Sequence, residues 1–161
     1  MNRRFLVVLV LGILLSSVPL SAQIRAEKPN DFSIELGGRC ILYSLNYQRM
    51  ISPAFGLEVG ASYFPAGLPF LEIEWVFLLS GGGRYYFINK NASPYLSGGI
   101  VWLPGGTNAG PISTAASGVY FYASPGFELR GAGGFVFRAG VNFLFEEGFK
   151  VMPGIHLGFA F

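Results

Sequence analysis

Residues 135–161 run FVFRAGVNFLFEEGFKVMPGIHLGFAF, and the order of apolar and polar residues in this segment is the clearest indication of the architecture. In 135–145 every odd position is apolar, whereas the even positions include Arg138 and Asn142. In 151–161 the odd positions are again apolar and the even positions are mostly small. Because side chains alternate across a β-strand, each segment predicts a strand with one apolar face and one small or polar face.

The same alternation predicts eight strands in all, most of them near the 9 to 11 residues that a tilted strand needs to cross a bilayer. The connections alternate between short turns at 51–54, 88–93 and 131–133 and longer ones at 65–73 and 104–116. An even strand number with this alternation is typical of bacterial membrane barrels. We therefore predict an all-β, eight-stranded antiparallel up-and-down transmembrane barrel, with strands at 32–38, 42–50, 55–64, 74–87, 94–103, 117–130, 134–145 and 151–161.

Membrane-spanning helices are excluded although no charged residue lies between Asn91 and Glu128. Prolines and glycines interrupt every window of helix length in that region, and both residue types break helices. Two prolines also disturb the predicted ladder, because proline has no N–H to donate. We expect a bulge near Pro125, and Pro153 leaves open whether the last regular strand begins at residue 151 or after it.

Glycines indicate which face of the strands points inward. The narrow lumen of an eight-stranded barrel is filled by side chains and favours small ones. Glycines fall on the polar faces, so the apolar faces should meet lipid. The opposite arrangement would give a soluble, lipocalin-like barrel. The glycines concerned are Gly37, Gly56, Gly60, Gly82, Gly126, Gly140, Gly154 and Gly158.

Aromatic residues near the predicted strand ends should form belts at the membrane surfaces. We place Tyr95 in the belt nearer the periplasm. Tyr120 and Tyr122 share the register of Ser124, so for these two an inward direction stays open.

The amino terminus has the features of a cleavable signal peptide, with Arg3 and Arg4 before an apolar run and a small-residue region. We expect cleavage after Ala22, a short periplasmic segment at 23–31 and the barrel at 32–161. Removing two of the eleven basic residues leaves nine against nine acidic ones, so the mature chain is neutral. A nucleic-acid partner is therefore not expected. A single cysteine, Cys40, excludes an internal disulfide.

Ionisable residues on the inward faces are the candidate functional group. Buried charges are tolerated when they are paired, so we expect an ion-pair network that plugs the lumen. A gated pore in which these pairs exchange partners is the functional alternative. The residues are Glu35, Glu58, Arg84, Glu128, Arg138 and His156. No metal-ligand cluster and no cofactor site is expected.

The C-terminal run from Ile155 to Phe161 resembles that of bacterial outer-membrane proteins, ending in phenylalanine with an apolar residue at every second position. Segments such as 35–38, 82–86 and 134–140 are similar to the small outer-membrane barrel domains of Bacteroidota, and more widely to OmpA- and OmpX-type barrels. The resemblance implies a place in the outer membrane of a Gram-negative cell. It also implies that the barrel-assembly machinery binds the terminal strand through Ile155, Leu157, Phe159 and Phe161.

Four functions stay open from the sequence. The first is a structural or surface-interaction barrel, embedded in outer-membrane lipid, whose outer loops meet an extracellular partner. The second is a narrow channel for ions or small solutes. The third is a lipid-modifying enzyme, disfavoured because His156, the sole histidine, lacks a serine two residues on. The fourth is a soluble lipocalin-like ligand binder. We expect the protein not to be an enzyme.

Overall fold

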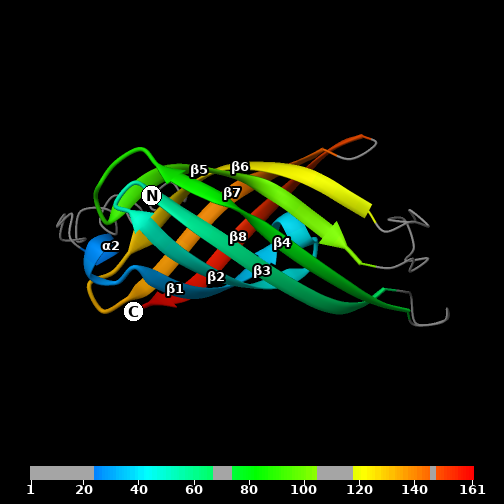
Figure 1. Ribbon diagram of the computed structural model, residues 1–161, viewed down its shortest axis with the longest axis horizontal. Coiled ribbons are helices and arrows are strands. Elements are labelled where there is room, and N and C mark those ends of the chain that lie inside the picture. The colour runs from blue at the N-terminus through cyan, green and yellow to red at the C-terminus, as the bar shows by residue number, and fades with distance from the viewer. Residues whose placement is uncertain (1–23, 67–73, 105–117, 146–147) are drawn as a thin grey trace, which may run out of the picture.

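Alternating apolar and polar residues form eight strands that close into one barrel (Figure 1). The computed structural model describes residues 24–66, 74–104, 118–145 and 148–161. The predicted fold class is confirmed, and each strand lies within two residues of its expected bounds. The strands are β1 (Asn30–Gly37), β2 (Tyr43–Ser52), β3 (Phe55–Ala66), β4 (Glu74–Tyr86), β5 (Ala92–Leu103), β6 (Gly118–Arg130), β7 (Phe135–Phe145) and β8 (Phe149–Ala160).

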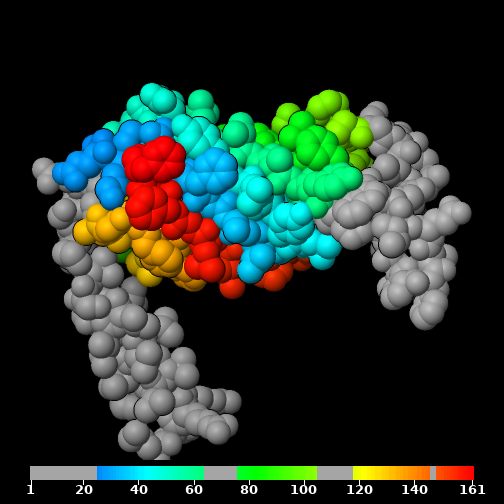
Figure 2. Space-filling view, turned by 90° about the horizontal axis from the view of Figure 1, so that it is seen from below, coloured from blue at the N-terminus to red at the C-terminus, as the bar shows by residue number. Residues whose placement is uncertain are grey.

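Each strand is antiparallel to its neighbours, and β8 returns to pair with β1. Across this seam Asp31 lies opposite Ala160 and Gly37 lies opposite Gly154. Figure 2 shows this face of the molecule, with the red residues of β8 beside the blue residues of β1. Closure leaves no strand edge unpaired, which is the condition for a sheet to lie in a membrane.

The two ends of the barrel differ. At one end, here called the terminus end, lie α2 (Ile24–Glu27), the last residue and the short connections 53–54, 87–91 and 131–134 (Figure 1, left). At the other, here called the loop end, β1 is joined to β2 through the 3-10 helix η1 (Gly38–Cys40). The predicted outer loop 104–116 lies outside the described residues beyond Pro104, as does the predicted signal peptide.

Side chains of the strands alternate between an outward-facing side and a lumen-facing side. In β1 the burial alternates so that Phe32, Ile34 and Leu36 are exposed, whereas Asp31, Ser33 and Glu35 are buried. Phe121 of β6, at 61% exposure, is among the most exposed apolar residues. A large apolar residue so exposed is unfavourable in water and favourable against acyl chains.

Two expectations are wrong in detail, and one open alternative is decided. Pro125 causes no bulge: Ala123 pairs with Phe143 and Gly126 with Gly140, so the register is the same on both sides. Strand β8 begins at Phe149 and contains Pro153, which pairs with Val141. Tyr95 points into the lumen and not into a belt, because it shares the parity of the buried Ser93 and Ser97. Tyr120 and Tyr122 point inward as well.

The described helices are short, and none of them is long and apolar enough to cross a membrane.

Candidate functional site: the closed lumen

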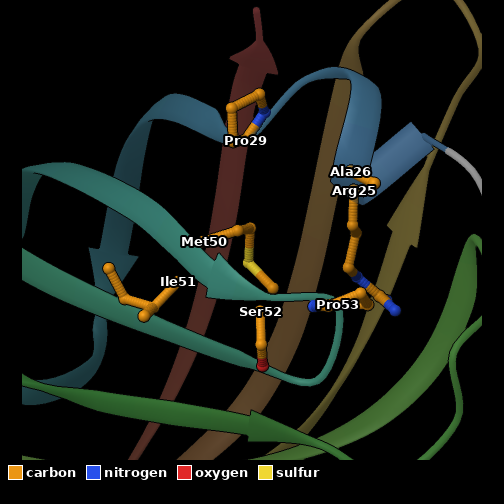
Figure 3. A pocket seen from close by; sticks show the side chains of 7 residues that line it. All are labelled: Arg25, Ala26, Pro29, Met50, Ile51, Ser52 and Pro53. Carbon is orange, nitrogen blue, oxygen red and sulfur yellow. The ribbon is translucent and has the colours of Figure 1, made fainter.

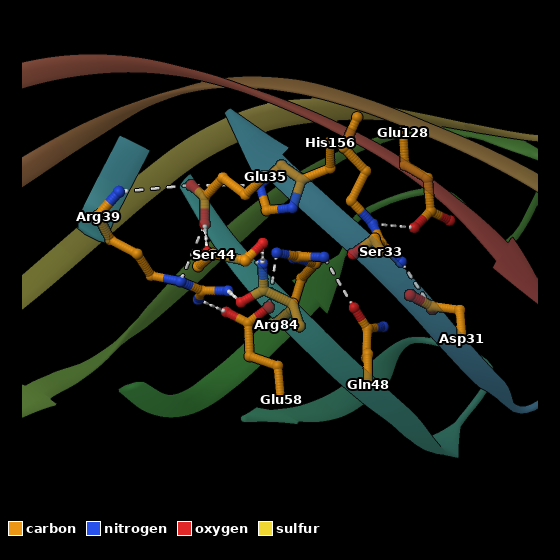
Figure 4. A network of polar contacts seen from close by, with 12 residues as sticks. Asp31, Ser33, Glu35, Arg39, Ser44, Gln48, Glu58, Arg84, Glu128 and His156 are labelled. Carbon is orange, nitrogen blue, oxygen red and sulfur yellow. Dashed lines mark hydrogen bonds and ion pairs between the residues drawn. The ribbon is translucent and has the colours of Figure 1, made fainter. Parts of the chain in front are cut away.

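The six inward ionisable residues predicted from the sequence all lie inside the barrel and are buried. They come from six strands, so the fold gathers groups far apart in the chain. Figure 4 shows the network that they form with neighbouring side chains. Their strands are β1 for Glu35, β3 for Glu58, β4 for Arg84, β6 for Glu128, β7 for Arg138 and β8 for His156.

Glu128 is the centre of the cluster in the terminus-end half of the lumen. Its Oε1 lies 3.0 Å from Nε of Arg25 and 3.3 Å from Nε of Arg130. Its Oε2 accepts hydrogen bonds from Nε of Arg138 at 2.7 Å and from the hydroxyl of Tyr86 at 2.6 Å. One carboxylate therefore serves three guanidinium groups and a phenol.

Asp31 is the second carboxylate of this cluster. Its Oδ2 lies 2.7 Å from Nη2 of Arg130 and 2.7 Å from Nη2 of Arg138. The two strand-borne arginines are thus held by two carboxylates each. Charge-assisted hydrogen bonds of this kind are shorter and stronger than neutral ones, and they fix the arginine forks in place.

Arg25 enters this cluster from outside the strands. It lies on α2, and its Nη1 donates to the backbone oxygen of Ile88 at 3.1 Å. Its guanidinium carbon lies 4.1 Å from the ring centre of Tyr86, a cation–π distance. The segment 23–31, which the sequence analysis predicts as a short periplasmic segment before the barrel, therefore carries a side chain that caps the lumen.

A second cluster lies between the first one and η1. Oε1 of Glu58 lies 2.5 Å from Nη1 of Arg39, and its Oε2 lies 2.6 Å from Nη2 of Arg84. Glu35 lies 3.3 Å from Nε of Arg39 and 3.4 Å from Nε2 of His156. Two arginines face two glutamates here.

Arg39 reaches the lumen because η1 folds inward. Gly37 and Gly38 have φ of 70° and 73°, a region that favours glycine, and they turn the chain into the barrel. A methyl group on Gly38 would overlap the carboxylate of Glu35. Ile41 also has a positive φ of 77°, which is strained for a β-branched residue. The inward turn is thus held against local preference by the contacts of Arg39.

The two clusters are connected through Gln48. Nη1 of Arg84 donates to Oε1 of Gln48 at 2.7 Å, and Nε2 of Gln48 donates to the hydroxyl of Tyr86 at 2.9 Å. A continuous polar chain therefore runs from Arg39 on η1 to Arg25 on α2.

Apolar side chains fill the lumen beside the polar chain, which the sequence analysis did not foresee. Val76, Leu78, Val101, Leu103 and Leu144 pack with Cys40 and two tyrosines into a buried cluster. Met50, Tyr86 and Tyr95 form a second one. The inward faces are therefore not uniformly small or polar.

Cys40 is buried within the first of these apolar clusters. Burial raises the pKa of its thiol to about 11, because the thiolate is poorly solvated there. The thiol is therefore neutral at physiological pH.

Several residues of the site were missed by the sequence analysis. Asp31 and Arg130 share the strand parity of Glu35 and Glu128, so alternation could have found them. Arg25 and Arg39 lie outside strands, where alternation gives no direction. Within the described ranges no group of three or more histidine, cysteine or acidic residues could hold a metal ion.

The barrel is similar to solved outer-membrane structures. The N-terminal β-barrel domain of Pseudomonas aeruginosa OprF matches with a TM-score of 0.60 at 17% identity, over 83% of this chain and 98% of that one. The Yersinia pestis outer membrane protein Ail, solved in a phospholipid bilayer nanodisc, matches with a TM-score of 0.51 at 12% identity, over 83% of this chain and 99% of that one. No family model and no curated protein matches the sequence. The predicted resemblance to small outer-membrane barrels is confirmed at the level of the fold.

Proposed function

We propose that this chain is an integral outer-membrane barrel with a structural or surface-interaction role and a lumen closed by its own side chains. The observation that carries the proposal is the sorting of side chains. Phe32, Val59 and Phe121 are more than half exposed, whereas every charged group of the two lumen clusters is buried. A soluble barrel would favour the reverse arrangement.

The closed lumen supports an interaction role over a channel. Arg25 and Arg39 enter from opposite ends, and apolar side chains fill the space beside the polar chain between them. Eight-stranded barrels have interiors just wide enough for side chains. In the proposed orientation the terminus end faces the periplasm, and the long connections at the loop end face outward to meet extracellular partners.

The exposed apolar residues of β8 support an assembly role for that strand. Ile155, Leu157, Phe159 and Phe161 all face outward and are 47–54% exposed. We propose that they dock on the barrel-assembly machinery during insertion and contact lipid afterwards.

We also propose that the protein has no enzymatic activity on lipid. His156 is 3% exposed and faces Glu35 inside the lumen, whereas lipid would lie against the outer surface. Overproduction in a Gram-negative host should leave the lipid A profile unchanged. A new lipid A species that disappears in the His156→Ala variant would contradict this.

The proposal is tested by location, closure and conductance. The protein should fractionate with the outer membrane, and the extracted protein should migrate faster on a detergent gel when unheated than when boiled. In planar bilayers it should show no discrete openings. Recovery from the soluble periplasm would favour the lipocalin-like alternative. Discrete openings that are lost in Arg138→Ala would favour the channel.

A further inference from the structure

The two charged clusters of the lumen differ in charge balance. In the cluster next to η1, Arg39 and Arg84 face Glu35 and Glu58. In the terminus-end half the three guanidinium groups around Glu128 share only that carboxylate and Asp31. Among the described residues the terminus-end half therefore carries one positive charge without a matching carboxylate. A buried charge without an opposite partner is unfavourable, and an anion would relieve it.

Arg25 is the arginine whose positive charge is not fully compensated. Each side-chain nitrogen of Arg130 and of Arg138 has an acceptor among the described residues. Arg25 uses Nε on Glu128 and Nη1 on the oxygen of Ile88, whereas its Nη2 is buried with no hydrogen-bond partner in the described part of the chain. A charged donor left in this state is costly, so a ligand oxygen that reached it would be bound strongly.

An open pocket lies beside this guanidinium (Figure 3). Its volume is about 200 Å³, and it is lined by Arg25, Ala26, Pro29, Met50, Ile51, Ser52 and Pro53. No acidic side chain lines it, so nothing in the wall opposes an anion. The Ser52 oxygen accepts the backbone N–H groups of Ala54 at 3.4 Å and Phe55 at 3.1 Å, so the turn after β2 holds this wall of the pocket.

We propose that this pocket binds a phosphate group, with the guanidinium of Arg25 as its charged donor. The volume is below the roughly 300–1,000 Å³ of pockets for drug-sized ligands, and it suits one small tetrahedral anion. Most of the other lining residues are apolar, and one of them, Ile51, is exposed. The phosphate could therefore be free or the headgroup of a lipid at the membrane surface, and the experiment separates these sources.

The test is a titration of the protein, extracted from membranes into detergent, followed by NMR of the arginine Nε–H groups. Inorganic phosphate and short-chain phosphatidic acid are added separately at constant ionic strength. We expect the Arg25 signal to shift and saturate. A shift with both ligands identifies phosphate itself as sufficient, and a shift with phosphatidic acid alone identifies a lipid headgroup. No saturable shift with either ligand would overturn the proposal.

Variants measured by calorimetry separate a site from general charge attraction. Arg25→Gln removes the donor and should weaken binding about tenfold or more, as loss of a charge-assisted hydrogen bond does. Ala26→Phe fills the pocket, leaves Arg25 in place and should weaken binding similarly. The matched control is Arg49→Gln, an exposed arginine of β2 that does not line the pocket, and it should bind as the native protein does.

The unheated gel band shows whether each variant forms a closed barrel. Native affinity in Ala26→Phe would reject the pocket. An equal loss in Arg49→Gln would mean that the anion is drawn to the general charge of this end, and the proposal would fall.

Discussion

At the scale of single residues, the interior depends on carboxylates that are shared by several cations. A carboxylate has about four lone-pair sites, so Glu128 can satisfy three guanidinium groups and a phenol at once. The stability of the barrel therefore depends strongly on this one group, because losing one carboxylate leaves several buried charges unpaired.

Replacing Glu128 with glutamine should destabilise the barrel by about 3–5 kcal/mol, the usual loss when one partner of a buried ion pair is removed. The free energy of unfolding, measured by urea titration of the protein in lipid vesicles, checks this. Glu27→Gln is the matched control, since Glu27 is exposed on α2. Equal stability of the two variants would contradict the central role of Glu128.

The thiol of Cys40 offers a pH-dependent probe. Its pKa rises from 9.0 to about 11 in the folded protein, and the thiolate is the reactive form. Between pH 9 and 11 the unfolded chain should therefore alkylate rapidly while the folded chain stays protected. Rates of reaction with iodoacetamide against pH, with and without urea, measure this. A folded-state midpoint near 9 would show that η1 leaves the lumen readily.

At the scale of elements, alternation identified all eight strands because each one separates two different environments. The same rule placed Glu58 and Arg84 inside, since their neighbours on the strand point outward. It gave no information on α2 or η1, because a short helix or a turn has no period of two. The lumen positions of Arg25 and Arg39 could therefore be found only from the structure. The same holds for the apolar residues near Val101, because strand parity alone does not say which face points into the lumen.

Strand β4 allows a test of the inward and outward faces at adjacent positions. A methyl group on Gly82 would overlap the carbonyl oxygen of Gly98 and the hydroxyl of Tyr122, whereas one on Gly81 would meet open space. Gly82→Ala should therefore lower the stability by about 1–3 kcal/mol, as overpacking does. Gly81→Ala should be near neutral. Urea unfolding of both variants in vesicles measures the two stabilities. If Gly81→Ala were the less stable variant, Gly81 and not Gly82 would face the lumen.

At the scale of the whole molecule, the outward residues should form a band whose tolerance of charge depends on depth. Val59 lies midway along β3, and Ile51 lies near the end of β2. Val59→Arg should be destabilising by about 2–4 kcal/mol and Ile51→Arg by about 0–1 kcal/mol, the values found for arginine at the midplane and near the interface. Unfolding in vesicles measures both, and equal effects would argue against a membrane-embedded band.

The seam between β1 and β8 has a consequence for biogenesis. The ring is completed only by ladders that join Asp31 to Ala160 and Glu35 to His156, partners contributed by the first and last strands. Before β8 pairs with β1, a sheet of β1 to β7 has two unpaired edges, and each edge can form hydrogen bonds with a strand of another chain. The two unpaired edges therefore need protection until β8 has been added. Any factor that inserts this chain has to cover these edges during that time.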